Sequence, residues 1–299
     1  MNMDFKSAKE LLDLCEENQL PISEVMRQRE CLLGETPRDA VDHRMGKAWE
    51  IMRSSATQPL KKPIKSMGGL IGGEAKKLET HYNKKKNICG DVLQKAMTYA
   101  MAVLEVNASM GLIVAAPTAG SAGVVPGMML ALQECYRISD QRIVDALFNA
   151  GAVGYLAMRN ATVAGAVGGC QAEVGAASGM AAAALVDIKG GTAEQCAEAF
   201  AMALTNLEGL VCDPVAGLVE IPCIKRNVIG AMTAVSAADM ALAGVVGHIP
   251  ADEVIDAMAE VGNAMSKDLR ETGIGGLAGT PTGRAICEIV TMDNGEEED

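Results

Sequence analysis

The sequence predicts an all-α fold: a single helical domain with a central buried helix. Helix signals recur along the 299 residues, whereas the alternating β-branched runs that mark strands are nearly absent. Hydrophobic residues make up 49% of the chain and charged residues 21%, which is the balance of a globular protein. Only one Trp, four Tyr and three Phe are present, so alanine, methionine and glycine must fill the core. Small side chains of this kind favour closely packed helices.

Charge and motif content argue against two classes of function. With 26 basic and 38 acidic residues the net charge is −12, which argues against a nucleic-acid partner. The glycine-rich stretch 68–77 does not satisfy the P-loop pattern, and residues 119–123 have an alanine where a nucleophile elbow begins with glycine. Part of the negative charge lies in the last seven residues, which are expected to form a solvated tail: Asp293, Glu296, Glu297, Glu298 and Asp299.

Residues 1–57 are expected to form a helical preamble. Ser7 with Glu10 makes a capping-box pattern before a leucine-rich run, and Pro37 starts a second helix that extends toward Met52. The first residues are acidic where a secretory signal needs a basic start and an apolar run. We therefore expect a cytoplasmic protein.

Residues 58–90 differ from the segments on either side. Pro59, Pro63 and the glycine cluster 68–73 predict a loop region, either a domain boundary or an active-site loop. The same stretch is rich in lysine, at positions 61, 62, 65, 76, 77, 84, 85 and 86.

From Asp91 onward the helical pattern returns. A capping box at Thr192 and Gln195 marks one helix start, and Pro250 ahead of two acidic residues marks another. The segment 175–186 contains four consecutive alanines and is apolar all round, so it is the predicted buried helix. The expected helices cover 91–113, 124–135, 140–158, 175–186, 192–207, 227–246 and 251–267.

An uncharged stretch of 28 residues, 106–133, is long enough to raise the question of a transmembrane helix. Its middle, 116–123, contains a proline, two hydroxyl residues and glycines, which would break the helix and leave backbone groups unpaired in lipid. We therefore expect two buried helices that meet at an irregular loop.

Three of the nine cysteines stand apart from the rest. Cys170, Cys212 and Cys223 each lie at a glycine- or proline-rich junction, where a ligand can reach a thiol. Their spacings, 42 and 11 residues, match no zinc ribbon, and no histidine lies close in sequence. Ligation by three thiolates alone suggests an iron–sulfur cluster with one iron left open. Inert buried thiols are the alternative that the spacing leaves open.

The segments around these cysteines, taken with two glycine-rich loops, resemble a known family. Between about residues 60 and 280 they look like the α subunit of the iron–sulfur-dependent L-serine dehydratases. The resemblance implies that the three cysteines hold a [4Fe–4S] cluster. The motifs that carry it are Gly68-Gly-Leu-Ile-Gly-Gly-Glu74, Ala116-Pro-Thr-Ala-Gly-Ser-Ala-Gly123, Gly169-Cys-Gln-Ala-Glu-Val-Gly175 and Cys212-Asp-Pro-Val-Ala-Gly-Leu-Val-Glu-Ile-Pro-Cys223.

The family resemblance implies a lyase that converts L-serine to pyruvate and ammonia. An iron without a thiolate ligand would act as a Lewis acid on the departing hydroxyl, which is a poor leaving group. On this interpretation residues 58–285 form the cluster-binding catalytic α domain and residues 286–299 an acidic C-terminal tail. Two alternatives stay open: an L-cysteine desulfidase-like lyase, and a non-enzymatic iron–sulfur redox sensor.

The loop 116–123 suits a small amino-acid substrate, because its hydroxyls and glycine-flanked N–H groups can approach a carboxylate. A polar helix junction is the alternative. Asn160 and Glu173, which flank Cys170, are candidates for orienting the cluster or the substrate. The expected substrate-binding residues are Thr118, Ala119, Gly120, Ser121, Lys65, Ser66, Gly68 and Gly69.

Two departures from the family pattern shape the expected assembly. Single-chain members carry a further domain with a Ser-Ser-Ser-His-Thr segment, whereas the nearest run here, 54–57, lacks the histidine. We therefore expect a partner β subunit that supplies this segment. The general base is unidentified, and the same subunit could supply it. Some single-chain members also end in a cysteine that can occupy the open iron. Here Cys287 is followed by twelve more residues, so it is either a displaceable fourth ligand or has no such role.

Overall fold

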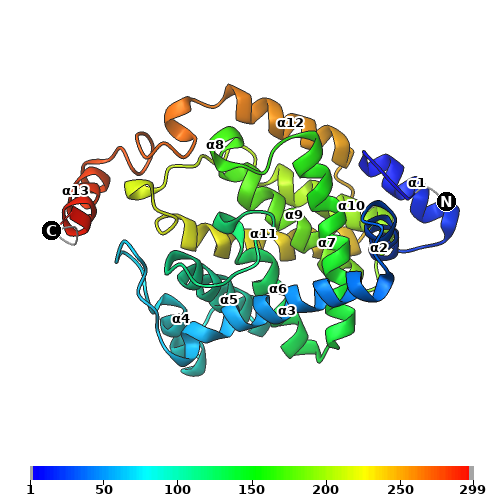
Figure 1. Ribbon diagram of the computed structural model, residues 1–299, viewed down its shortest axis with the longest axis horizontal. Helices are drawn as coiled ribbons and strands as arrows, with labels where there is room; N and C mark the ends of the chain where they lie inside the picture. Colours follow the sequence, from blue (N-terminus) through cyan, green and yellow to red (C-terminus); the bar gives the residue numbers. More distant parts are fainter. Residues whose placement is uncertain (1–2, 296–299) are drawn as a thin grey trace.

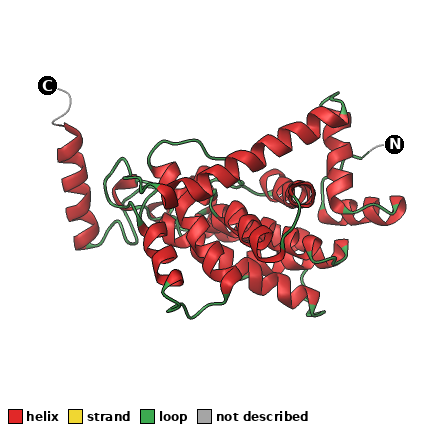
Figure 2. Cartoon of the chain, turned by 90° about the horizontal axis from the view of Figure 1, so that it is seen from below, coloured by secondary structure: helices red, strands yellow, loops and turns green. Residues whose placement is uncertain are grey.

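The computed structural model describes residues 3–295, and every regular element among them is helical (Figures 1 and 2). Over this range no β-strand forms, and one isolated bridge pairs Cys212 with Arg270. The predicted all-α fold is confirmed. The helices are α1 (Ala8–Asn18), α2 (Ile22–Leu33), α3 (Arg38–Lys61), α4 (Glu74–Asn83), α5 (Asp91–Ala108), α6 (Val124–Tyr136), α7 (Asp140–Asn160), α8 (Gly165–Gly168), α9 (Ala176–Ile188), α10 (Ala193–Thr205), α11 (Cys223–Leu242), α12 (Ala251–Ala264) and α13 (Pro281–Gly295), with short turns η1 (Ala119–Ser121), η2 (Gln171–Gly175), η3 (Val215–Gly217) and η4 (Lys267–Leu269).

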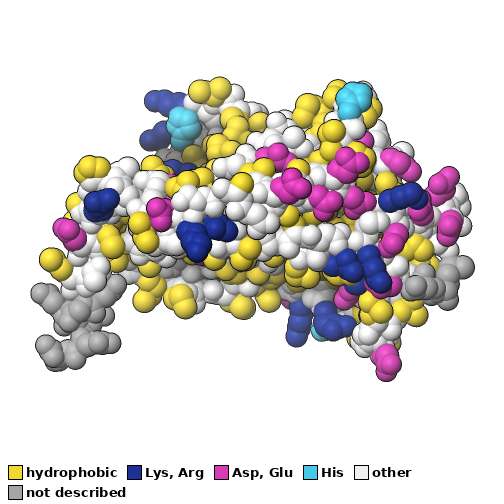
Figure 3. All heavy atoms as spheres, turned by 90° about the horizontal axis from the view of Figure 1, so that it is seen from above, with side chains coloured by type: hydrophobic (Ala, Val, Ile, Leu, Met, Phe, Trp, Pro, Cys, Tyr) yellow, Lys and Arg dark blue, Asp and Glu magenta, His cyan; other side chains and the backbone are white. Residues whose placement is uncertain are grey.

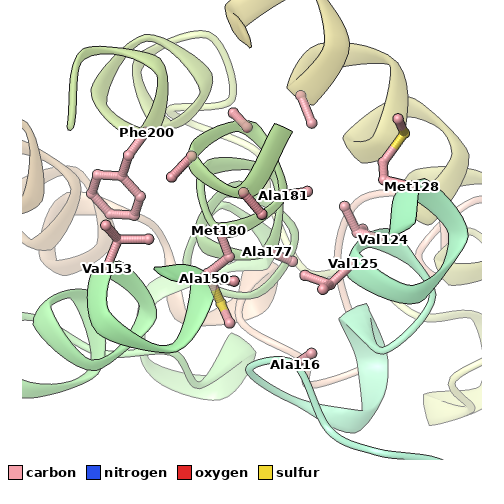
Figure 4. Close-up of a cluster of buried hydrophobic side chains, with 14 of the residues drawn as sticks. Ala116, Val124, Val125, Met128, Ala150, Val153, Ala177, Met180, Ala181 and Phe200 are labelled. Carbon is pink, nitrogen blue, oxygen red and sulfur yellow. The ribbon is translucent and has the colours of Figure 1, made fainter. Parts of the chain in front are cut away.

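Helix α9 is the central buried helix that the sequence predicts. Its residues from Ala176 to Asp187 are all buried, and α6, α7, α10 and α11 pack around it (Figure 1). Figure 4 shows Phe200 of α10 beside Val153 of α7, and Met180 of α9 close to Ala150 of α7. A Cβ at Gly179 would lie 2.5 Å from the Phe200 ring, so a larger residue there would push the two helices apart.

The N-terminal helices belong to the same core. The Ser7 hydroxyl accepts a hydrogen bond from the Glu10 N–H and caps α1, as the sequence predicts. Helix α3 is longer than expected, because it continues past Met52 and accommodates Pro59 in its last turn. It therefore runs without a break through position 57, where the preamble was expected to end.

The uncharged stretch forms two buried helices, α5 and α6, joined by an irregular loop, as predicted. Helix α5 ends at Ala108 rather than near residue 113, because Met110 takes a left-handed conformation (φ 60°) and the Gly111 N–H turns back to the Val106 carbonyl. No described helix is long and apolar enough to cross a membrane.

The region 58–90 contains a helix that the sequence did not indicate. Helix α4 follows Gly73 (φ 89°), and the buried carboxylate of Glu105 on α5 accepts a hydrogen bond of 2.9 Å from the Ala75 N–H. Burial raises the pKa of Glu105. A buried carboxylate from a distant helix therefore caps α4, and this interaction has no local sequence pattern.

Two further boundaries differ from expectation. Helix α11 begins at Cys223, about one turn before residue 227, because Pro222 ends the preceding loop and fits the start of a helix. It ends at Leu242, since Gly244 (φ 83°) takes the left-handed conformation that terminates helices.

Helix α13 stands apart from the helical body at the left of Figure 1 and lies close to η3. Residues 286–295, expected as part of an acidic tail, continue this helix, whereas the acidic residues 296–299 lie outside the described residues. On the face in Figure 3, acidic side chains gather on the side where α12 and α1 lie.

Candidate metal centre

Cys170 sits between two short, unusual turns. Helix α8 ends at Gly168, and Gly169 (φ 75°) reverses the chain before the single π-helical turn η2 leads into α9. A Cβ at Gly169 would lie 2.9 Å from the Leu210 carbonyl oxygen, and its positive φ also disfavours any other residue. The glycine therefore brings the Cys170 segment against the segment that carries Cys212.

Cys212 and Cys223 are fixed by different means. The Cys212 N–H donates to the Leu269 carbonyl (2.8 Å) and its carbonyl accepts from the Glu271 N–H (2.6 Å), so the C-terminal loop holds this backbone. Cys223 is the first residue of α11, where the helix dipole favours negative charge. Both side chains are buried.

Two of the cysteines meet at one carboxylate. One sulfur each from Cys170 and Cys212 and an oxygen of Glu173 all lie within 4.8 Å of one another. Burial raises the pKa of the Cys223 thiol to about 12, and negative charges on Cys170 and Glu173 add to the shift. Arg226, on the same helix as Cys223, donates to Cys170 Sγ, so the start of α11 borders this group. The structure thus brings together Cys170, Cys212 and one of the two flanking polar residues that the sequence singled out, with Cys223 on the bordering helix.

Arg226 supplies positive charge to this group. It lies one helical turn after Cys223, and its Nη1 donates to Cys170 Sγ (3.3 Å) and to the Val211 carbonyl (2.7 Å). Its Nη2 donates to Asp213 Oδ1 (2.7 Å). A hydrogen bond from Cys212 and the guanidinium charge together lower the pKa of Cys170, whereas the hydrogen bond to Cys170 and burial raise the pKa of Cys212. The guanidinium of Arg226 therefore favours the thiolate form of Cys170.

Glu173 is held in place by the loop 116–123. The Thr118 hydroxyl donates to Glu173 Oε1 (2.7 Å) and lies 3.1 Å from the Ser121 hydroxyl. Burial raises the pKa of Glu173, and the hydrogen bond from Thr118 opposes this effect. A Cβ at Gly120 would lie 3.1 Å from Oε1, so glycine gives the carboxylate its space.

Asn227 ties the same loop to Cys223. Its side-chain oxygen accepts from the Gly123 N–H (3.0 Å), and its Nδ2 donates to the carbonyls of Gly120 (2.8 Å) and Cys223 (3.0 Å). The side chain is fully buried, so all three hydrogen bonds are made away from water.

The glycine-rich loop 65–73 reaches the cysteine segment through Glu220. This buried carboxylate accepts from the Ser66 hydroxyl (2.6 Å), the Gly68 N–H (2.8 Å) and the Leu70 N–H (3.0 Å). The Ser66 hydroxyl and the Gly68 N–H therefore donate to Glu220, and these hydrogen bonds fix the loop. Lys65 is exposed, and its side chain lies over Gly69.

Two residues considered from the sequence lie elsewhere. Asn160 is the last residue of α7, and its side chain donates to the Lys6 carbonyl (2.8 Å) in the N-terminal segment rather than to the cysteine segments. Cys287 is exposed on α13 and does not join the compact group of ligand atoms found among the described residues. All three histidines are exposed: His43, His81 and His248.

Sequence reasoning missed four polar residues that organise the site. Arg226 could have been found, because a basic residue three positions after a cysteine shares its helix face. Asp213 could also have been noticed beside Cys212. Glu220 and Asn227 act through contacts across more than 100 residues, for which the local sequence holds no signal.

Comparison with known proteins identifies the family. The family model described as "Serine dehydratase alpha chain" matches residues 17–278. The chain belongs to the serine dehydratase alpha chain family. This alpha chain is 50% identical over 282 residues to the "Probable L-serine dehydratase, alpha chain" of Bacillus subtilis, covering 94% of each chain. It is 45% identical to the "L-serine dehydratase, alpha chain" of Peptoniphilus asaccharolyticus, covering 94% of this chain and 97% of that one. The "L-serine dehydratase" of Helicobacter pylori is 39% identical over 93% of this chain, which spans 62% of that longer protein.

The donor set of this alpha chain suits an iron–sulfur cluster. All three cysteines are free thiols and are buried, and thiolates are the ligands that such clusters prefer. Arg226 offers a hydrogen bond to the Cys170 sulfur, and hydrogen bonds to sulfur are one way in which proteins tune the reduction potential of a cluster. A Cβ at Gly165 would lie 3.0 Å from Cys212 Sγ and 2.8 Å from Glu173 Oε2, so glycine keeps this side of the group clear.

Proposed function

We propose that the chain is the catalytic α subunit of an L-serine dehydratase, which deaminates L-serine to pyruvate and ammonia. Cys170, Cys212 and Cys223 would hold a [4Fe–4S] cluster. The observation that supports this most is that buried Cys170 and Cys212 from separate segments meet at Glu173, which the hydroxyl-bearing loop holds, while Asn227 ties buried Cys223 to the same loop. Family membership supports the reaction class, which is that of a lyase.

When bound, the cluster would supply an iron without a thiolate ligand, a Lewis acid suited to the hydroxyl that serine loses. The residues of the chain set the conditions around it. Arg226 offsets negative charge on the thiolates, and Gly120 and Gly165 keep bulk away from the Glu173 carboxylate. Glu173, fixed by Thr118, would orient the substrate or the cluster.

The loop that carries Thr118 and Ser121 would bind the substrate carboxylate. The two hydroxyls are 3.1 Å apart, and the glycines beside them let backbone N–H groups approach a ligand closely. We place the glycine-rich loop on the other wall of this site because Glu220 joins it to the cysteine segment. The full proposed set is Thr118, Ala119, Gly120, Ser121, Lys65, Ser66, Gly68 and Gly69.

We further propose that a β subunit completes the enzyme. Two of the relatives are named alpha chains, and the relatives named without a chain designation are longer, this chain spanning 62% of the Helicobacter pylori protein. We propose that the general base comes with the partner, because none of the three histidines belongs to the group formed by Cys170, Glu173 and Cys212 in the described residues. Nine free cysteines also suit the reducing cytoplasm, where we place the complex.

Pyruvate formation tests the proposal. The chain is purified anaerobically with its partner subunit, loaded with iron and sulfide, and assayed with L-serine and with L-cysteine. We expect pyruvate and ammonia in equal amounts from L-serine, and a higher kcat/KM for L-serine than for L-cysteine. A higher kcat/KM for L-cysteine would instead favour the desulfidase alternative, and no turnover of either amino acid by the loaded complex would contradict the proposed lyase.

A further inference from the structure

We infer that Cys170, Glu173 and Cys212 bind a single divalent ion of the Zn²⁺ or Fe²⁺ class when the chain carries no cluster. The inference rests on the proposed function in one respect: it concerns the chain from which the proposed cluster, with its iron and sulfide, is absent. Cys223 has no part in this mononuclear site, although it is a proposed cluster ligand. The mononuclear site therefore has Glu173 as a ligand where the proposed cluster site has Cys223.

The spacing of the ligand atoms supports a mononuclear site. The two sulfurs and the carboxylate oxygen lie within 4.8 Å of one another. Bonds of about 2.3 Å to sulfur and about 2.0–2.2 Å to oxygen place tetrahedral ligand atoms about 3–4 Å apart. Small side-chain rotations bring the three atoms to that spacing. Cys223 is not part of a group this compact in the described portion of the chain.

The Glu173 carboxylate is already aimed at the cysteines. Thr118 holds Oε1 with a hydrogen bond of 2.7 Å. The other oxygen, Oε2, lies on the side of Cys212, because a Cβ at Gly165 would touch both Oε2 (2.8 Å) and Cys212 Sγ (3.0 Å). No side chain separates these two atoms at that point, so an ion can bridge them.

The chemistry of the donors selects the class of ion. Two thiolates with one carboxylate suit Zn²⁺ and Fe²⁺, whereas Mg²⁺ and Ca²⁺ prefer oxygen ligands alone. Both cysteines are only 2% exposed, so negative charge on them needs compensation. Arg226 provides part of this compensation, because its Nη1 lies 3.3 Å from Cys170 Sγ. It also pairs with Asp213, so negative charge remains on the two thiolates that a divalent ion can balance.

A consequence is competition between the ion and the cluster. Both need Cys170 and Cys212, so a bound Zn²⁺ would block cluster assembly until it is removed. Loading the chain with Zn²⁺ before adding iron and sulfide is expected to suppress cluster formation, and a chelator is expected to restore it.

Cobalt titration of the full chain, stripped of metal and sulfide under anaerobic conditions, tests the inference. Co²⁺ bound by thiolates gives a charge-transfer absorption in the near ultraviolet, and metal analysis counts the ions. We expect one Co²⁺ per chain, displaced by Zn²⁺. Cys170→Ala and Cys212→Ala should weaken binding by more than the roughly 10–100-fold that loss of an outer hydrogen-bond partner costs. Glu173→Gln should weaken it, while Cys223→Ala and Cys135→Ala, a half-buried control on α6, should leave it unchanged.

Two further variants keep the test decisive if a cysteine variant misfolds. Gly165→Ala removes no donor but places a methyl group between Glu173 Oε2 and Cys212 Sγ, so it should lower the affinity for Co²⁺. Gly151→Ala, with nothing within 4 Å of the added methyl, should not. Equal loss in Cys223→Ala and Cys212→Ala would overturn the inference, as would full Co²⁺ binding by Cys212→Ala.

Cluster loading separates this inference from the proposed function. In Cys223→Ala we expect Co²⁺ binding to persist while iron and sulfide fail to assemble a cluster. If the unaltered chain takes up no cluster but follows the Co²⁺ pattern, the proposed cluster fails and the mononuclear site stands. If it takes up a cluster but binds no Co²⁺ when stripped, the mononuclear site fails alone.

Discussion

The buried carboxylate of Glu220 accepts a hydrogen bond of 2.6 Å from the hydroxyl of Ser66, which lies 154 residues earlier in the chain. Two backbone N–H groups of the same loop, those of Gly68 and Leu70, donate to this carboxylate as well. The glycine-rich loop is thereby fixed to the segment between Cys212 and Cys223. A single side chain sets the position of one wall of the candidate site relative to two of its cysteines.

Replacing Glu220 should therefore disturb the site from outside it. Glu220→Gln presents one acceptor and an NH₂ group to three donors, so at least one hydrogen bond is lost, at a cost of about 1–3 kcal/mol. We expect kcat/KM for L-serine to fall by up to about 100-fold through a raised KM, because the loop shifts. The control is Glu74→Gln, a half-buried carboxyl at the start of α4 that accepts from the Gly72 N–H of the same loop, and this change should leave KM intact. Equal kinetics for the two variants would contradict the assigned role.

Gly120 should not tolerate a side chain. The methyl group of Gly120→Ala would lie 3.1 Å and 3.2 Å from the two Glu173 oxygens, so the carboxylate would have to move away from Thr118. We expect activity to fall by about 100-fold with little change in Tm. Gly151→Ala is the matched control in open space on α7, and it should stabilise the fold by about 0.5–1 kcal/mol. A fully active Gly120→Ala enzyme would show that Glu173 has no positional role.

Asn227 should matter for stability and activity together. Asn227→Leu leaves the Gly123 N–H and two carbonyls without this partner in a buried region, which costs about 2–4 kcal/mol in the free energy of unfolding. Chemical denaturation measures that loss. Asn206→Ala removes a part-buried hydrogen bond at the end of α10 and should cost no more than about 1 kcal/mol. A loss in Asn227→Leu as small as that of the control would rule out a structural role for the three hydrogen bonds.

Acid should weaken the packing of the N-terminal helices. A hydrogen bond from Arg38, with others from Gln28 and Arg27, lowers the pKa of Glu24 to about 2 from an ordinary value of 4.5. Because the folded-state pKa is the lower one, Glu24 stabilises the fold fully above pH 4.5, and this contribution disappears as the pH falls toward 2.

Unfolding curves at several pH values check this dependence. Glu24→Gln should destabilise the chain by about 1–3 kcal/mol at pH 7, and the difference from the unaltered protein should vanish near pH 2. The exposed Glu17→Gln should change stability little at either pH. A difference for Glu24→Gln that stays constant between pH 5 and pH 2 would be inconsistent with the lowered pKa.

Local sequence signals predicted most of the helices well. Thr192 and Gln195 form the reciprocal capping box that their spacing indicates, and α6 begins at Val124 as expected. The alanine-rich segment is the buried helix because alanine fits wherever helices approach closely. These features depend on residues within a few positions of one another, which a single sequence contains.

Features made by distant contacts could not be predicted. The N–H of Ala75 finds its partner in Glu105, and Ser66 finds its partner in Glu220. The π-helical turn after Cys170 lies between helix-like residues and depends on how Gly169 packs against Leu210. The cysteine positions pointed to the site, but the hydrogen bond from Thr118 to Glu173 and those that Asn227 makes to the loop 116–123 emerge only from the fold.

The iron and acid-labile sulfide content of the reconstituted chain tests the central claim most directly. The unaltered chain and the half-buried control Cys135→Ala should each hold about four iron and four sulfide ions per chain after anaerobic loading. Cys170→Ala, Cys212→Ala and Cys223→Ala should each lose the cluster and its visible absorbance while keeping a helical circular dichroism spectrum. Full iron and sulfide content in any one of these three variants would contradict the assignment of that cysteine as a cluster ligand.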